Sequence, residues 1–151
     1  MNVSRCIVIE SGRPLRSGDR EPVAADRLWE RIALLGRDDQ ILLELSIRGG
    51  ASHRQIGRLL NRSPGSVSRR LRRLGRRLHD PLVLALLHPA CPLEGDYRQI
   101  GVERFLCGTP MPELAAKHQV SSARLRSILL FIRGWHRVSR GAKERRLTHV
   151  G

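Results

Sequence analysis

The segment SVSRRLRRLGRRL, residues 66–78, has leucines and arginines that recur with helical spacing. On a helix that advances about 100° per residue, Val67, Leu71, Leu74 and Leu78 fall within one narrow sector. The arginines fall on the opposite side, at Arg69, Arg70, Arg72, Arg73, Arg76 and Arg77. The segment therefore predicts a helix with one buried apolar edge and one cationic face.

Residues typical of helix starts and ends predict three more helices before this segment. Pro22 and the apolar spacing after it predict a helix over 22–35, and RDDQILLELSIRGG predicts a second helix that ends at its two glycines. Ser52 can cap a short third helix. Ser63 with Pro64 is a typical start for the long basic helix.

A tight turn is predicted between the short helix and the basic helix. Gly57 leaves room for two helices to approach closely, and Asn61 tolerates the left-handed backbone of such a turn. Arg62 occupies the position after the turn, where an aliphatic residue is usual. Either its side chain extends outward over the edge of the core, or the turn is looser than expected. The order of elements predicts a helix-turn-helix preceded by supporting helices.

Residues 34–78, LLGRDDQILLELSIRGGASHRQIGRLLNRSPGSVSRRLRRLGRRL, resemble region four of bacterial sigma factors. That domain binds the upstream promoter element in the major groove, and the resemblance implies a DNA-facing helix with Ser63, Pro64, Ser66, Ser68, Arg69, Arg70 and Arg73 along it. No aromatic-rich segment resembles the sigma domain that melts DNA. The resemblance therefore implies a transcription regulator without the melting domain of a complete sigma factor.

Separate roles are expected for the basic side chains of this unit. Ser66, Arg69, Arg70 and Arg73 are expected to meet base edges or phosphates in the major groove. Further DNA contacts, mainly to the phosphate backbone, are expected from Arg54, Arg72, Arg76 and Arg77.

The composition supports a polyanionic partner. The chain of 151 residues has a net charge of +14 that comes mostly from arginine, whose fork of donors suits phosphate and guanine. Aromatic residues make up only 3%, which disfavours single-strand binders that stack bases on rings. Double-stranded DNA is the expected partner. The alternatives are a protein-interaction module that docks on RNA polymerase or another acidic partner, and a structured-RNA binder.

The second half of the chain repeats this pattern. Ala115 and Leu125 follow Gly57 and Val67 by the same interval of 58 positions, which suggests an internal duplication. Candidate DNA contacts in this unit are Ser121, Ser122, Arg124, Arg126 and Ser127. Leu130, Phe131 and Trp135 instead favour a protein interface, such as a homodimer contact. The sequence leaves both roles open.

The predicted fold class is all-α, with two tandem helix-turn-helix units joined by a short apolar linker helix. The expected parts are an N-terminal arm (1–21), a first unit (22–80), a linker (81–96), a second unit (97–138) and a basic tail that orders on phosphate (139–151). The three cysteines form no close pair, which favours a reducing compartment.

Catalysis is not expected. The sequence has no phosphate-binding glycine loop of nucleotide hydrolases and no setting that would activate a serine or cysteine. The histidines are scattered without the spacing of metal ligands, so no metal and no cofactor is expected. The sequence also has no apolar run of membrane-spanning length, and a cytoplasmic protein without membrane contacts is expected.

Overall fold

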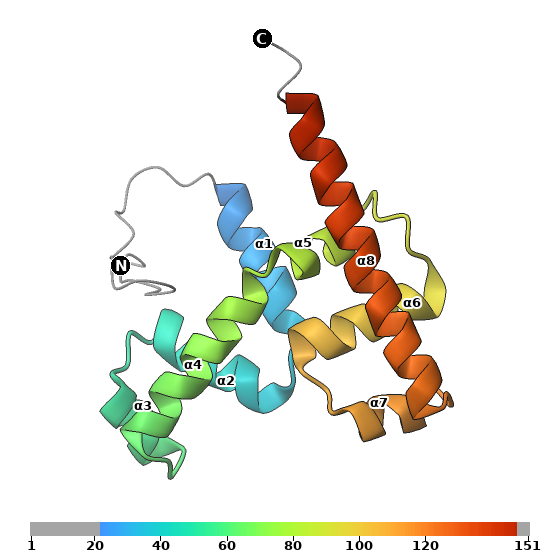
Figure 1. Cartoon of the computed structure of the whole chain (residues 1–151). Helices are drawn as coiled ribbons and strands as arrows, with labels where there is room; N and C mark the ends of the chain where they lie inside the picture. Colours follow the sequence, from blue (N-terminus) through green and yellow to red (C-terminus); the bar gives the residue numbers. More distant parts are fainter. Residues whose placement is uncertain (1–21, 148–151) are drawn as a thin grey trace. The chain divides into compact units, whose positions relative to one another are not determined.

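The computed structural model describes residues 22–147 and divides into two compact units (Figure 1). The first unit ends at His79 and the second begins at Asp80. All regular elements of the described residues are helical, with eight α-helices and no strand, which confirms the predicted all-α class. The expected N-terminal arm, residues 1–21, and the last four residues lie outside the described part.

The first unit consists of α1 (Pro22–Ala33), α2 (Arg37–Ile47), α3 (His53–Leu59) and α4 (Pro64–Leu78). Its core side chains come from all four helices and the α1–α2 turn: Ile32, Leu35, Leu42, Leu43, Ile56, Val67, Leu74 and Leu78. α3 packs closely on α4, and α1 and α2 also contact α4. The Arg31 guanidinium donates to the Leu78 carbonyl oxygen at 2.8 Å, which satisfies an open acceptor at the end of α4.

Hydroxyl side chains begin α3 and α4 as predicted. The Ser52 hydroxyl accepts the Gln55 backbone N–H, and the Gln55 side chain accepts the Ser52 backbone N–H at 2.8 Å in return. The Ser63 hydroxyl accepts the Ser66 N–H at 3.2 Å, with Pro64 in the first turn of α4. These caps fix where the two helices begin.

The turn between α3 and α4 is tight. A Cβ on Gly57 would lie 2.5 Å from the Arg62 carbonyl oxygen, and the Arg62 N–H donates to the Gly57 carbonyl at 2.8 Å. Asn61 has a φ of 50°, in the left-handed region. The Arg62 side chain is exposed. Of the two alternatives for Arg62, the structure therefore shows the outward side chain on a tight turn.

The second unit contains α5 (Pro81–Leu87), α6 (Gly95–Val102), the π-helical turn η1 (Glu103–Cys107), α7 (Met111–Lys117) and α8 (Ser122–Leu147). The segment 81–96 was expected to be a linker, but α5 belongs to this unit. Leu82 and Leu86 of α5 and Leu93 are buried in the same cluster as Ile100, Leu114 and Leu125. The prediction underestimated α5 because its apolar face needs the later helices to cover it.

The second unit repeats the helix order of the first at a constant interval of 58 residues. α2, α3 and α4 begin at 37, 53 and 64, and α6, α7 and α8 begin at 95, 111 and 122. Left-handed residues follow the same interval, with Gly108 after Gly50 and Gln119 after Asn61. In the sequence, two pairs of residues at this interval suggest a repeat. In the structure, the helix starts and the left-handed residues follow the same interval.

α8 is longer than its counterpart α4. The residue equivalent to Leu78, the last residue of α4, is His136, but α8 continues to Leu147. The predicted tail from 139 is therefore helical over most of its length. Residues 142–147, AKERRL, are all good helix formers, which explains the extension. Among the described helices, none combines the length and apolar composition needed to span a membrane.

Candidate nucleic-acid interface

α4 has a buried edge and a cationic outer face. Val67, Leu74 and Leu78 are each about 1% exposed, as the spacing predicted, and Leu71 is half-buried. The opposite side carries exposed arginines at positions 69, 72, 73 and 76. No acidic residue occurs between Glu44 and Asp80, so no carboxylate of this stretch offsets the charge. This face can attract a polyanion.

Arg69 and Arg72 lie along α4 toward its N-terminus. The Arg69 guanidinium comes within 3.6 Å of the place a Cβ on Gly65 would occupy, and Arg72 donates to the Ser68 hydroxyl at 3.3 Å. Helical side chains usually lean this way. Both guanidiniums are therefore held toward the N-terminal half of α4.

The serines and the proline near the start of α4 have mostly structural positions. The Ser63 hydroxyl is the cap, Pro64 forms the first turn, and Ser66 and Ser68 are half-buried. Of the predicted DNA-facing residues, the arginines are the ones that present large cationic groups to solvent.

Two arginines of α4 are less exposed than their helical spacing predicted. The Arg70 Nε donates to the Asp39 carboxylate at 2.7 Å and links α4 to α2. Arg77 is half-buried. Arg70 was expected to contact DNA, but its charge is already balanced by Asp39, so the geometry favours a structural role.

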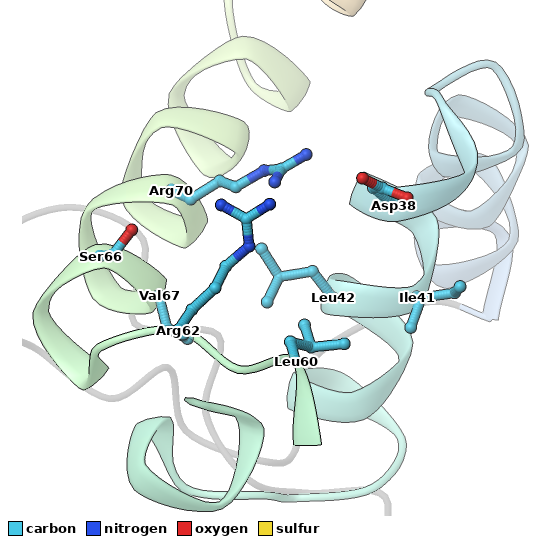
Figure 2. Close-up of a pocket in the computed structure, with 8 residues that line it drawn as sticks. All are labelled: Asp38, Ile41, Leu42, Leu60, Arg62, Ser66, Val67 and Arg70. Carbon is cyan, nitrogen blue, oxygen red and sulfur yellow. The ribbon is translucent and has the colours of Figure 1, made fainter. Parts of the chain in front are cut away.

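A cavity of about 140 Å³ lies beside this link, lined by residues of α2, α4 and the α3–α4 turn. Figure 2 shows the Arg62 and Arg70 side chains pointing toward one another, with Asp38 across the cavity and Leu42 beneath. Asp38 and Asp39 balance the two guanidiniums in charge. The cavity is therefore poorly suited to a free anion.

A larger hollow of about 510 Å³ lies over α3 and the start of α4. It is lined by Arg54, Arg58 and Arg62, with polar Asn61 and Ser63 and no carboxylate. Arg54 was a predicted DNA contact, whereas Arg58 and Arg62 were not assigned. Arg54 and Arg58 are four residues apart on α3 and share one side of that helix, which was the available signal for Arg58. Arg62 lies in the turn after α3, where helical spacing gives no signal. The hollow extends the cationic face of α4 onto α3.

The second unit lacks this cationic hollow. The positions equivalent to its three arginines, 58 residues later, hold Pro112, Ala116 and Val120. All five predicted contacts of this unit are exposed, but three of them also have local partners. Ser121 caps the helix, Ser127 donates to the Ala123 carbonyl, and Arg124 donates to the Tyr97 hydroxyl at 3.1 Å.

The apolar residues predicted as a protein interface separate into two groups. Leu130 and Phe131 are 67% and 55% exposed. Trp135 is half-buried and packs against the core of the second unit. Trp135 therefore contributes to folding, and Leu130 and Phe131 remain as surface groups.

One titratable cluster lies in the second unit, around Glu103. Burial raises the pKa of this carboxyl, but hydrogen bonds from Lys117, Gln99 and His118 outweigh burial and lower the pKa to about 2. The same contact raises the pKa of Lys117. The carboxylate is fully occupied by these donors, so the cluster links α6 and η1 to α7. Within residues 22–147, no group of three His, Cys, Asp or Glu side chains could hold a metal ion.

Comparison with known proteins gives no further information. The chain matches no protein-family model, no curated protein and no solved structure. The functional interpretation therefore depends on the residues and geometry above.

Proposed function

We propose that the first unit is a sequence-specific, double-stranded DNA-binding domain of a transcription regulator, as its resemblance to sigma region four implies. One observation carries the proposal: α4 is anchored by its buried edge and presents Arg69, Arg72, Arg73 and Arg76 on one exposed face. A rigid helix with a cationic face fits the major groove. α3 and the tight turn support this helix as a helix-turn-helix does.

The contacts divide by position. The N-terminal half of α4 enters the major groove, where Arg69 and Arg73 meet base edges. Arg72 and Arg76 hold the phosphates beside the groove. Arg54, Arg58 and Arg62 line the hollow next to the start of α4 and bind the phosphate backbone of the same duplex. The second unit takes no part in base recognition, because Ser127 and Phe131 replace the two base-contacting arginines at its equivalent positions.

Selection from a random pool tests the proposal. The full chain is titrated by fluorescence anisotropy against random-sequence duplex DNA and an equal-length duplex RNA at several salt concentrations, and bound DNA is sequenced. An enriched motif and a steep, linear fall of log affinity with log salt are expected. Loss of a base-contacting arginine costs about 1–3 kcal/mol at one base pair, so Arg69→Ala should relax selection there.

Matched variants separate base contacts from phosphate contacts. Arg58→Ala should weaken binding to all duplexes alike and reduce the salt slope by about one. Arg27, exposed on α1, provides the control, and Arg27→Ala should change neither quantity. Equal loss for Arg69→Ala on selected and scrambled duplex would refute base contact by Arg69. Preferential binding of duplex RNA would contradict the DNA proposal as a whole.

A further inference from the structure

The outer face of α8 exposes a continuous apolar surface, which we call the α8 outer face and define by Leu130, Phe131, Gly134, Val138 and Gly141. Leu130, Phe131 and Val138 are 67%, 55% and 70% exposed. On the helix these five positions fall within a sector of about 100°. Both glycines have open space where a Cβ would stand, so the large side chains project beside shallow gaps.

Phe131 is held in place on this face. Its ring meets the Tyr97 ring edge-on, with centroids 5.6 Å apart and planes at 81°. The Tyr97 hydroxyl is in turn fixed by Arg124 at 3.1 Å. An exposed aromatic ring that is already ordered loses little conformational entropy when a partner covers it.

Several α8 side chains after His136 are exposed. Val138, Ser139, Arg140 and Ala142 are exposed, and Gly141 is only partly covered. These turns lie beyond the end of the segment that corresponds to α4, and Figure 1 shows them extending past α5, α6 and α7. A partner along this face would cover the exposed Val138 side chain.

The first unit shows that the fold does not require this face to be apolar. At the equivalent positions α4 has Arg72 for Leu130, Arg73 for Phe131 and Arg76 for Gly134. The two helices share most of their buried edge, since Val67, Leu71 and Leu74 correspond to Leu125, Leu129 and Ile132. The two outer faces therefore suit different partners.

Charge identifies the kind of partner. Three arginines flank the α8 outer face within an adjoining sector of about 40°, at positions 126, 133 and 137. No acidic residue occurs between Glu113 and Glu144. An antiparallel second copy of α8 would place these arginines opposite the same arginines, which is unfavourable, whereas a helix with acidic flanks would neutralise them.

We propose that the α8 outer face binds an acidic amphipathic helix of another protein. The apolar side chains of that helix cover Phe131 and Val138 and enter the gaps over Gly134 and Gly141. Its carboxylates lie opposite the flanking arginines, Arg126 and Arg137 among them. This is the groove mode of helix recognition, with anchors at intervals of three, four and seven residues. The proposal does not depend on DNA binding by the first unit.

A designed probe tests the proposal on the full chain. The probe is a labelled synthetic helix of about five turns with leucines at positions i, i+3, i+4 and i+7 and glutamates elsewhere. Two control peptides replace its glutamates by lysines or its leucines by serines. Saturable binding of the acidic leucine peptide is expected in fluorescence anisotropy, with affinity at least about tenfold higher than for either control.

Variants locate the binding site. Phe131→Ser and Val138→Ser should each weaken binding about tenfold or more, and Arg137→Gln should weaken it less and reduce its salt dependence. Leu59→Ser is the matched control, because Leu59 is 68% exposed in α3 of the first unit and lies outside the proposed face. It should leave binding unchanged. Circular dichroism verifies that each variant is folded, and Val138 lies beyond the packed part of α8.

Three outcomes would overturn the proposal. Equal binding of the three peptides would show that the face selects neither charge nor apolar spacing. A dimer in sedimentation equilibrium that Phe131→Ser dissociates would show that a second copy occupies the face. Binding to vesicles of phosphatidylcholine and phosphatidylserine that Phe131→Ser abolishes, without peptide binding, would identify a lipid surface instead.

Discussion

Protonation of Glu103 should destabilise the second unit between about pH 4.5 and pH 2. The Glu103 side chain is 13% exposed, and its carboxylate accepts hydrogen bonds from Lys117 at 2.8 Å and Gln99 at 2.9 Å. The second oxygen lies 3.0 Å from the His118 ring Nε2. Against the opposing effect of burial, these contacts lower the pKa from 4.5 to about 2.

The size and sign of the effect follow from that pKa. At about 1.4 kcal/mol for each pH unit, the difference between 4.5 and about 2 corresponds to at most about 3.5 kcal/mol. The folded state has the lower pKa, so this stability is complete above pH 4.5 and is lost as the pH falls toward 2. It is a large share of the total for a small unit, since domains of this size have roughly 5–10 kcal/mol.

The two tryptophans allow the second unit to be followed separately. Trp29 is in α1 and Trp135 is in α8, so Trp29→Phe leaves a fluorescent reporter in the second unit. In this background, urea unfolding is measured from pH 7 to about pH 2.5 with Glu103 and with Glu103→Gln. The variant should be about 2–3 kcal/mol less stable at pH 7, and the difference should shrink toward zero at the lowest pH.

A matched control is an exposed carboxylate at the start of α6. Glu94 makes no capping hydrogen bond with its side chain, so Glu94→Gln should change stability by less than about 0.5 kcal/mol at every pH. An equal loss for Glu103→Gln at low pH and at pH 7 would contradict this prediction, because a pH-independent loss would come from packing and not from the charged carboxylate.

Three further changes test the turns and the link between helices by urea unfolding. Gln119→Gly should stabilise the second unit by about 1 kcal/mol, because glutamine is strained at a φ of 53°. Asn61→Gly should stabilise the first unit less, because asparagine tolerates the left-handed region. Equal gains in stability for the two substitutions would contradict this account. Gly57→Ala should cost about 1–3 kcal/mol, since its Cβ would lie 2.5 Å from a carbonyl oxygen, and an unchanged midpoint would show that the turn shifts freely. A double-mutant cycle of Arg70→Met and Asp39→Asn should give a coupling of about 0.5–1.5 kcal/mol, and additive losses would mean that the ion pair contributes nothing.

Much of the first unit could be predicted from its sequence because the deciding signals are local. Caps at Ser52 and Ser63, the small residue at Gly57 and the left-handed Asn61 act within a few residues of their own positions. The buried edge of α4 follows from spacing alone. These features need no knowledge of the rest of the fold.

The features that the sequence did not reveal depend on contacts between distant segments. Arg70 lies 31 positions from Asp39 in the sequence, and helical spacing gave no sign of their link. α5 looked like a linker because the residues that bury Leu86 come much later in the chain. Arg58 and Arg62 belong to a cationic hollow formed only when the turn folds back beside α4. Periodicity predicts which side of a helix is buried, but not which partner it meets.

The two units together separate what folding requires from what binding requires. At buried positions the pairs Ile56 and Leu114, Val67 and Leu125, and Leu74 and Ile132 all remain aliphatic. At exposed positions the residue class changes, from arginine at 58, 72 and 73 to alanine, leucine and phenylalanine 58 positions later. Folding requires aliphatic side chains at the buried positions, but it does not require any one residue class at the exposed positions. The difference therefore fits the two proposals, a phosphate backbone as the partner of one unit and an acidic amphipathic helix as the partner of the other.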